Sequence, residues 1–121
     1  MGKKSVTDLT YLHKMTMGDN EIILETVQIF LKTTPQTLIN LQNYCDHQEW
    51  EKLAAEAHKI KPDLIYMGMN EAHQLIVNIE RKAKNQKPEE IEHQIEELSI
   101  ICNKGLEELS KKVNELKSET G

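Results

Sequence analysis

Apolar residues recur at intervals of three and four along most of this 121-residue chain, and short breaks separate the runs. Such spacing puts one apolar stripe on each helix, because an α-helix turns once in about 3.6 residues. Each stripe must be buried against another element, and short connections make consecutive helices antiparallel neighbours. The sequence therefore predicts an all-α, antiparallel up-and-down four-helix bundle with a short additional N-terminal helix.

The first two helical runs differ in length. A short helix is expected over about Thr7–Thr16, with Asp8 or Thr7 as its cap, and it should cover one end or side of the bundle. The second run spans Asp19–Gln48, with Asp19 as cap. Pro35 lies inside it and either kinks one helix or starts a new one, because proline removes an amide and crowds the preceding turn. We favour one kinked helix.

The remaining three runs carry the most regular stripes. The third is expected over about Gln48–Met67, with Gly68 in the left-handed position after its end. Asn70 is expected to cap the fourth, and Pro88 to lie in the first turn of the fifth, which reaches roughly 45 Å at ~1.5 Å per residue. The inward positions are Trp50, Leu53, Ala57, Ile60, Leu64 and Met67, then Ala72, Leu75, Ile76, Ile79 and Ala83, then Ile91, Ile95, Leu98, Cys102, Leu106, Leu109, Val113 and Leu116.

Charge and length exclude several classes of function. The net charge is −5, and no basic stripe interleaved with aromatic residues offsets it, which argues against nucleic acid as a partner. No run of about 18 apolar residues exists, and the N-terminal Met1–Ser5 lacks the apolar stretch of a secretion signal, so no membrane span and a cytoplasmic setting are expected. The length fits a single domain over 1–121, with a bundle core at about 7–115 that does not require a second copy, so a monomer is expected.

Thiol and metal chemistry find little support. Cys45 and Cys102 lie on apolar patterns, where thiols are more often buried and reduced than bridged. Glu90 and His93 match half of a carboxylate-bridged di-metal pattern, but the second half does not occur. We therefore expect no metal site.

His58 lies roughly 130° from the centre of the third helix's inward stripe, at about 100° per residue. Its ring is therefore expected to face water. Lys61 follows one turn later, within reach of the imidazole, and the small Ala54 one turn before leaves the approach to the ring uncrowded. Lys59 is exposed on the other flank, where it adds local positive charge or contacts a partner.

A lone exposed imidazole beside lysines is typical of a phosphoryl acceptor. Histidine is mostly neutral at pH 7, so a ring nitrogen attacks phosphorus without prior deprotonation, and the product is a high-energy phosphoramidate. The chain has no Gly-rich phosphate loop and no carboxylate cluster for magnesium. We therefore expect no cofactor of its own: Mg²⁺ and the donor or acceptor carboxylate should come from a partner protein, which implies an intermediate in a relay.

The run Ala57–Lys61, with Gly68 ten residues after the histidine, resembles the histidine-containing phosphotransfer (HPt) domain family. The resemblance covers roughly Thr7–Glu115. It implies a four-helix bundle whose exposed histidine, on the second bundle helix, shuttles phosphate between the receiver domains of hybrid sensor histidine kinases and response regulators.

The resemblance carries roles onto individual residues of this chain. It implies that His58 is the phosphoacceptor and that Lys59 and Lys61 are its basic flanking residues. Family members often place a polar side chain of the next helix near the imidazole, and Glu80 occupies that position here. A carboxylate holding one ring nitrogen would orient the other for attack. The alternative for Glu80 is a solvated surface position.

Pro62 departs from the family, which usually has glycine four residues after the histidine. The glycine leaves room for the incoming receiver, whereas proline is larger and removes the amide that would bond the carbonyl of His58, so a bend is expected. The alternative is that the helix ends at Lys61 and restarts after Pro62.

Receiver docking needs apolar side chains around the charged centre. Ile65, at i+7 from His58, is the strongest candidate. The expected docking residues are Ala54, Pro62, Ile65 and Gly68, with Met17, Met69 and Tyr11 as contributors from adjoining segments. For each methionine, a place in the core is the alternative.

Three classes of function therefore compete. The leading one is a phosphorelay intermediate that accepts phosphate on His58 from a receiver aspartate and passes it to another receiver. The second is a helical docking module that does not transfer phosphate, for instance because Pro62 spoils the site. The third is an enzyme or metal protein.

Overall fold

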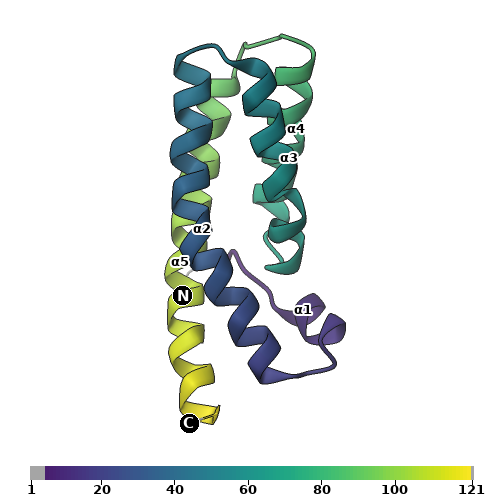
Figure 1. The fold of residues 1–121 in the computed structure, drawn as a ribbon, viewed down its shortest axis with the longest axis vertical. Helices are drawn as coiled ribbons and strands as arrows, with labels where there is room; N and C mark the ends of the chain where they lie inside the picture. Colours follow the sequence, from purple (N-terminus) through teal and green to yellow (C-terminus); the bar gives the residue numbers. More distant parts are fainter. Residues whose placement is uncertain (1–4, 121) are drawn as a thin grey trace.

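A computed structural model describes residues 5–120 of the chain, with side chains as far as Ser118. This part contains five α-helices and no strand (Figure 1). The helices are α1 (Thr10–Met15), α2 (Asn20–Asp46), α3 (Trp50–Tyr66), α4 (Asn70–Lys84) and α5 (Ile91–Thr120). The prediction of an all-helical chain is therefore confirmed. Residues 1–4, on which the expectation about a secretion signal rests, lie outside the described residues.

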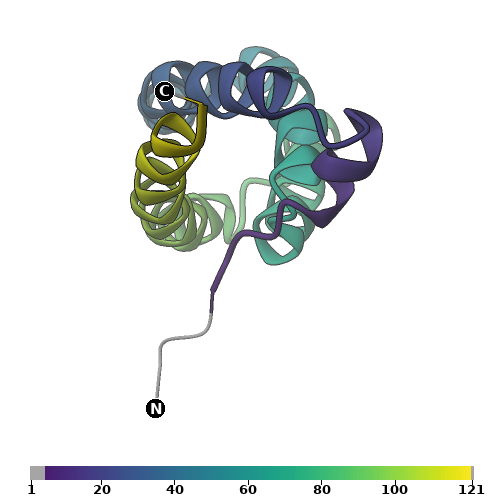
Figure 2. The same ribbon diagram turned by 90° about the horizontal axis from the view of Figure 1, so that it is seen from below.

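Helices α2, α3, α4 and α5 surround a shared apolar core. α3 packs against α2 and α4, and α5 packs against the same two helices. Seen end-on, the four helices form a ring (Figure 2). The predicted stripes of α3, α4 and α5 supply most of the core, including Leu53, Ala57, Ile60, Leu64, Ile76, Ile79, Ile91, Ile95, Leu98, Cys102 and Leu109. Helix α2 adds Ile23, Val27, Phe30 and Leu41 among others. Burial of one face of each helix fixes which residues face outward.

Helix α2 begins and continues as its sequence predicts. The carboxylate of Asp19 accepts hydrogen bonds from the backbone N–H groups of Glu21, at 3.0 Å, and Ile22, at 3.2 Å, so it caps the helix. Pro35 lies inside one uninterrupted helix. The N-terminal part of α2 leans away from the axis of the rest (Figure 1). The alternative of a second helix starting at the proline is therefore wrong.

Helix α3 also passes through a proline without a break. Pro62 lies inside it, so the alternative in which the helix ends at Lys61 is wrong. Ile65 stays on the surface, with 44% of its area exposed. Gly68 follows the helix with φ +65°, the left-handed conformation that was predicted for it.

Two predicted helix starts need correction. Asn70 does not cap α4: the helix already includes it, and the cap position belongs to Met69, which makes no side-chain hydrogen bond there. Pro88 lies before α5 rather than in its first turn. The Ile91 N–H donates to the carbonyl of Pro88 across a turn at 3.1 Å, and Glu90 has φ +71°, which keeps this segment out of the helix.

Glu108 on α5 holds the N-terminal segment. Its carboxylate accepts hydrogen bonds from the hydroxyls of Ser5, at 2.7 Å, and Thr7, at 2.6 Å, and from the backbone N–H groups of Val6 and Thr7, each at 3.0 Å. Partial burial raises the pKa of Glu108, but these hydrogen bonds outweigh it and hold the pKa below its usual value. Helical spacing does not predict this contact, because it joins residues that are far apart in the chain.

Helix α1 lies outside the ring, beside the end of α3 (Figure 2). The Asp8 N–H donates to the carbonyl of Met67 at 3.0 Å, and the rings of Tyr11 and Tyr66 stack with centroids 6.0 Å apart. Leu12 is buried in the core. The short first helix therefore covers one side of the lower end, as expected, although it spans fewer residues than predicted.

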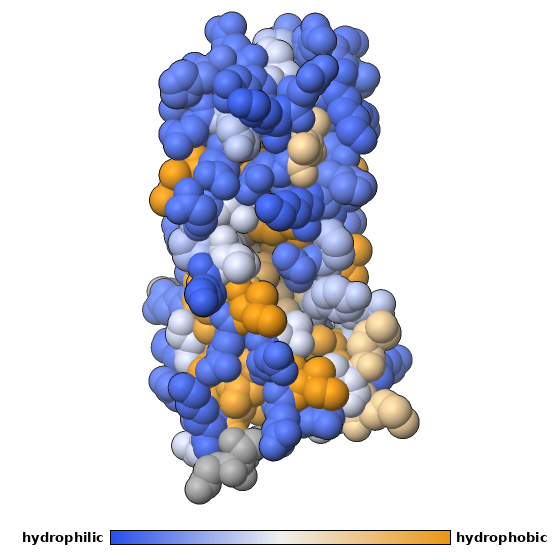
Figure 3. Space-filling model, viewed as in Figure 1, coloured by the Kyte–Doolittle hydropathy of each residue, from blue (hydrophilic) through white to orange (hydrophobic). Residues whose placement is uncertain are grey.

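The surface carries apolar side chains near α1. On the face shown in Figure 3 they gather in the lower half, over α1 and the N-terminal part of α2. Exposed residues of these segments include Met15, Met17 and Ile22, at 55%, 94% and 47% exposure. The spacing of Leu9, Leu12 and Met15 predicts one shared apolar face on the first helix, and for Met15 this prediction is wrong. Within residues 5–120, no helix is both long and apolar enough to span a membrane.

Gly68 and Gly18 provide a matched test of how closely the N-terminal segment approaches α3. Both have positive φ, +65° and +76°, so alanine costs about 1–2 kcal/mol at either position. A Cβ at Gly68 would also overlap the carbonyl of Asp8, whereas nothing lies within 4 Å of one at Gly18. We expect Gly68→Ala to lower the free energy of unfolding by about 3 kcal/mol, against about 1 kcal/mol for Gly18→Ala. Equal losses in urea denaturation would contradict the close approach.

Candidate functional site

His58 faces outward because its neighbours in the sequence face inward. Ala57 and Ile60 are buried, at 0% and 3% exposure, and they fix the rotation of α3. The imidazole of His58 is 70% exposed. The prediction that its ring faces water is therefore confirmed.

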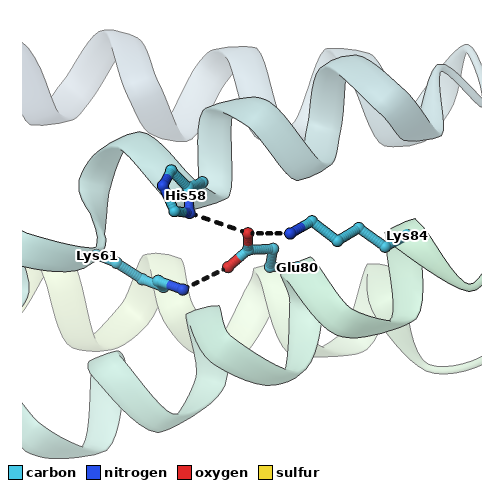
Figure 4. Close-up of polar contacts among 4 residues, drawn as sticks. All are labelled: His58, Lys61, Glu80 and Lys84. Atoms are coloured by element: carbon cyan, nitrogen blue, oxygen red, sulfur yellow. Dashed lines mark hydrogen bonds and ion pairs between the residues drawn. The ribbon is translucent and has the colours of Figure 1, made fainter.

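Glu80 on α4 lies beneath the imidazole. It follows the fully buried Ile79 in the sequence, and only 4% of its own area is exposed, because its side chain lies between α4 and α3. Its Oε2 is 3.1 Å from Nδ1 of His58 (Figure 4). The alternative of a solvated surface position for Glu80 is therefore wrong.

Two lysines converge on the same carboxylate (Figure 4). Lys61 Nζ donates to Oε1 of Glu80 at 2.7 Å, and Lys84 Nζ lies 2.9 Å from Oε2. Lys61 was expected near the imidazole, and it reaches this cluster through Glu80. Lys84 was not identified from the sequence. Its position four residues after Glu80, on the same helix, is the signal that could have found it.

The lysines keep Glu80 ionised. Burial by itself raises the pKa of this carboxyl, but the hydrogen bonds and positive charges of Lys61 and Lys84 outweigh burial and lower the pKa to about 2. A carboxylate with so low a pKa is negative at neutral pH. It therefore acts only as a hydrogen-bond acceptor.

This acceptor determines which nitrogen of His58 is free. A hydrogen bond between Nδ1 and a carboxylate requires the proton to be on Nδ1, since Glu80 has none to donate. In the neutral ring, Nε2 then carries the lone pair. The arrangement thus presents Nε2 as a nucleophile on an exposed surface, with cationic groups close by.

Lys59 lies apart from this cluster. It is exposed and lines a groove on the other flank of α3, against α2, together with Asn40 and Asp63. Partial burial raises the pKa of Asp63. The two lysines that flank His58 in sequence therefore lie in different environments, as their helical spacing predicted.

The expected docking residues next to His58 differ in exposure. Ala54 is nearly buried, at 5%, and forms part of a shallow groove beside His58 whose other lining residues include Trp50, Ala83 and Lys84. Pro62 is exposed. A docking role for Ala54, Pro62 and Ile65 stays a prediction.

The more distant docking candidates divide into surface and core. Gly68 is half-buried, and the backbone of Asp8 covers the side where its Cβ would lie. Tyr11 on α1 is 44% exposed and stacks on Tyr66. Met69 is fully buried, and its side chain lies over Gly105, where a Cβ would be 2.6 Å from its methyl group. A surface role for Met69 is therefore wrong, because the missing side chain of Gly105 makes room for it in the core.

The cysteines are free thiols. Cys102 is buried, and burial raises its pKa to about 12, so it stays protonated. Cys45 is half-buried, and burial together with the charges of Glu92 and Asp46 raises its pKa. Among the residues that the structure describes, no three His, Cys, Asp or Glu side chains gather in a way that could hold a metal ion.

The ionised state of Glu80 predicts how stability depends on pH. Its pKa is about 2 in the folded chain and near 4.5 in an unfolded one, so the unfolded state takes up the proton more readily. Glu80 therefore stabilises the fold above about pH 4.5, and this contribution is lost as the pH falls towards 2. We expect Glu80→Gln to lose less stability than the wild type as the pH falls from about 4.5 towards 2, because glutamine takes up no proton. The measurement is the free energy of unfolding in urea at several pH values. Parallel curves for the two proteins would contradict the assignment.

Comparison with known families gives a match over most of the chain. A family model described as the Hpt domain matches residues 25–119, which is most of the chain. This range includes the His58 cluster, which consists of His58, Lys61, Glu80 and Lys84. No curated protein and no solved structure matches. Hpt domains carry out histidine phosphotransfer in phosphorelays, together with receiver domains and kinases. The match over α2 to α5 and the exposed histidine agree, and the chain belongs to the Hpt domain family.

Proposed function

We propose that this chain is an intermediate in a multi-step phosphorelay. In this proposal, His58 accepts a phosphoryl group on Nε2 from the phosphorylated aspartate of a receiver domain and passes it to the aspartate of another receiver. The first receiver would belong to a hybrid sensor histidine kinase and the second to a response regulator. The observation that carries the proposal is the exposed imidazole whose Nδ1 contacts the buried carboxylate of Glu80.

The proposed transfer of the phosphoryl group forms one bond and breaks one. Nε2 attacks phosphorus, the P–O bond of the acyl phosphate breaks, and the electrons of that bond leave on the receiver's carboxylate. The proton on Nδ1 remains there, facing Glu80. The return step reverses these changes on the second receiver. Mg²⁺, which neutralises the phosphoryl oxygens, is supplied by the receiver.

Lys61 and Lys84 provide the positive charge near the reacting nitrogen. Their ammonium groups lie within 2.9 Å of the carboxylate that contacts the imidazole, so either can turn towards a phosphoryl group on the ring. Positioning and charge neutralisation of this kind together contribute most of the catalysis in phosphoryl transfer. Lys59, on the other flank, would act through the partner's surface.

The architecture suits docking of a receiver. We propose an antiparallel up-and-down four-helix bundle, supported by the opposite directions of successive helices from α2 to α5 in Figure 1. In such a bundle the surface around His58 is formed by rigid helices. Exposed Ile65 and Pro62 on α3 would supply the apolar part of the docking surface, and Ala54 would form part of its floor.

A non-transferring docking module is the second candidate. The exposed ring of Pro62, one turn after His58, favours it, because the family usually leaves that position open with glycine. In this case the chain would bind receivers without becoming phosphorylated. The outcome of the labelling experiment below separates the two candidates.

Labelling tests the phosphoacceptor directly. We expect incubation with a phosphorylated receiver domain and Mg²⁺ to give acid-labile, alkali-stable label on the wild-type chain and none on His58→Gln. His93→Gln is the matched control and should be labelled normally. His93 also lies 3.1 Å from a glutamate, but that glutamate is the exposed Glu97 on the same helix rather than a buried residue of a neighbouring helix. Binding of several competent receivers without any label would favour the docking module.

The two flanking lysines should differ in their effect on transfer. Lys61→Ala removes a cation from the His58 cluster, so the rate of phosphoryl transfer should fall about ten- to a hundredfold. Lys59→Ala removes a charge on the other flank and should have a smaller effect. The measurement is the single-turnover rate from a phosphorylated receiver at saturating concentration. Equal rates for the two variants would remove Lys61 from this role.

A further inference from the structure

One buried carboxylate holds both lysines of the His58 cluster. The side chain of Glu80 is only 6% exposed, and it accepts Lys61 on one oxygen and Lys84 on the other. Interactions of this kind are stronger away from water. In the unphosphorylated chain, the positive charges nearest His58 are therefore already bound to an anion of the same domain.

A phosphoryl group on His58 would face that anion across the ring. It carries up to two negative charges and attracts the same ammonium groups. The imidazole separates the two anions, with Glu80 on Nδ1 and phosphorus on Nε2. They repel each other, and each lysine must divide its interactions between them.

We propose that Glu80 is a positioning residue that competes with the phosphoryl group for Lys61 and Lys84 and thereby keeps phosphohistidine a ready phosphoryl donor. The inference rests on the proposed function. It adds a role for Glu80 in setting the equilibrium of the phosphoryl group between His58 and the receiver aspartate. A neutral residue at this position would leave both lysines to the phosphoryl group, and the phosphorylated state would be held more tightly.

The exposure of the lysines indicates which of them moves more easily. The side chain of Lys84 is 63% exposed and that of Lys61 only 29%. Lys84 also shares Oε2 with Nδ1 of His58. When Lys84 turns towards the phosphoryl group, this oxygen is left to the ring N–H alone, so the hydrogen bond that orients His58 is kept while the charge is redistributed.

Other charges around the groove do not offer the same exchange. Glu51 lines the groove beside His58 but is exposed on α3, where water screens it. Glu56, on the other flank of α3, accepts a hydrogen bond from Asn40 at 3.1 Å. Among the described residues, Glu80 is the acidic group for which contacts to His58, Lys61 and Lys84 are all observed.

The test replaces Glu80 by glutamine, which keeps an oxygen for the Nδ1 proton but removes the charge. Wild-type chain and Glu80→Gln are phosphorylated with potassium phosphoramidate, whose P–N bond breaks with release of ammonia, and each is then equilibrated with an unphosphorylated receiver and Mg²⁺. We expect the equilibrium to shift about tenfold towards phosphohistidine in Glu80→Gln. Glu56→Gln changes the net charge equally on the other flank and should match the wild type.

Two further measurements separate a change in charge from a change in structure. The ¹⁵N spectrum of the His58 ring should show the proton on Nδ1 in both the wild type and Glu80→Gln. Lys84→Met, which leaves Glu80 in place, should shift the equilibrium at least threefold towards the receiver, since the phosphoryl group loses a cation. This variant keeps the inference testable if Glu80→Gln folds poorly.

The outcomes distinguish the inference from the function on which it rests. A wild-type chain that is phosphorylated neither by phosphoramidate nor by a receiver overturns both. If the wild type is phosphorylated normally, the proposed function stands. The competition between Glu80 and the phosphoryl group is then overturned if Glu80→Gln shows the wild-type equilibrium or a shift towards the receiver. An unchanged equilibrium in Lys84→Met also overturns it, because Lys84 would then stay on Glu80 throughout.

Discussion

The rotation of α3 about its own axis is the constraint on which the site depends. Leu53, Ala57, Ile60 and Leu64 are buried together, and no other rotation of the helix buries all four. Since His58 immediately follows Ala57, burial of the stripe puts the imidazole at the edge of the surface, where it contacts α4 on one side and water on the other. Packing of α3 in the core thus fixes the position of the His58 imidazole, although the imidazole itself lies outside the core.

The second determinant is charge at the boundary between α3 and α4. A carboxylate buried as deeply as that of Glu80 is unfavourable unless cations pair with it, and removing one partner of such a group is costly. Lys61 comes from α3 and Lys84 from α4, so the ion pairs also join the two helices that carry the site. The same contacts therefore contribute to the fold and to the environment of the histidine.

Much of this arrangement could be predicted from helical spacing alone. The spacing of apolar residues within one helix predicts the stripes of α3 and α5. It also predicts the exposure of His58 and the separation of Lys59 from Lys61. Contacts between distant segments could not be predicted in this way. The hydrogen bonds from Ser5, Val6 and Thr7 to Glu108, and the fit of Met69 over Gly105, depend on how helices meet in space. The contact of Glu80 with His58 was reached through the family resemblance, and Lys84 was missed because it contacts His58 only through Glu80.

The contacts of the N-terminal segment bear on where this domain begins as a folding unit. The family match starts at residue 25, but α2 begins at Asn20 behind the cap Asp19. Leu12, farther upstream, fills part of the core, and Glu108 accepts its hydrogen bonds from residues 5–7. A fragment cut at the boundary of the match would lose the first turn of α2, expose apolar surface under α1 and leave a partly buried carboxylate without its donors. The region that the family model matches is therefore shorter than the stretch of chain whose side chains pack together in this structure.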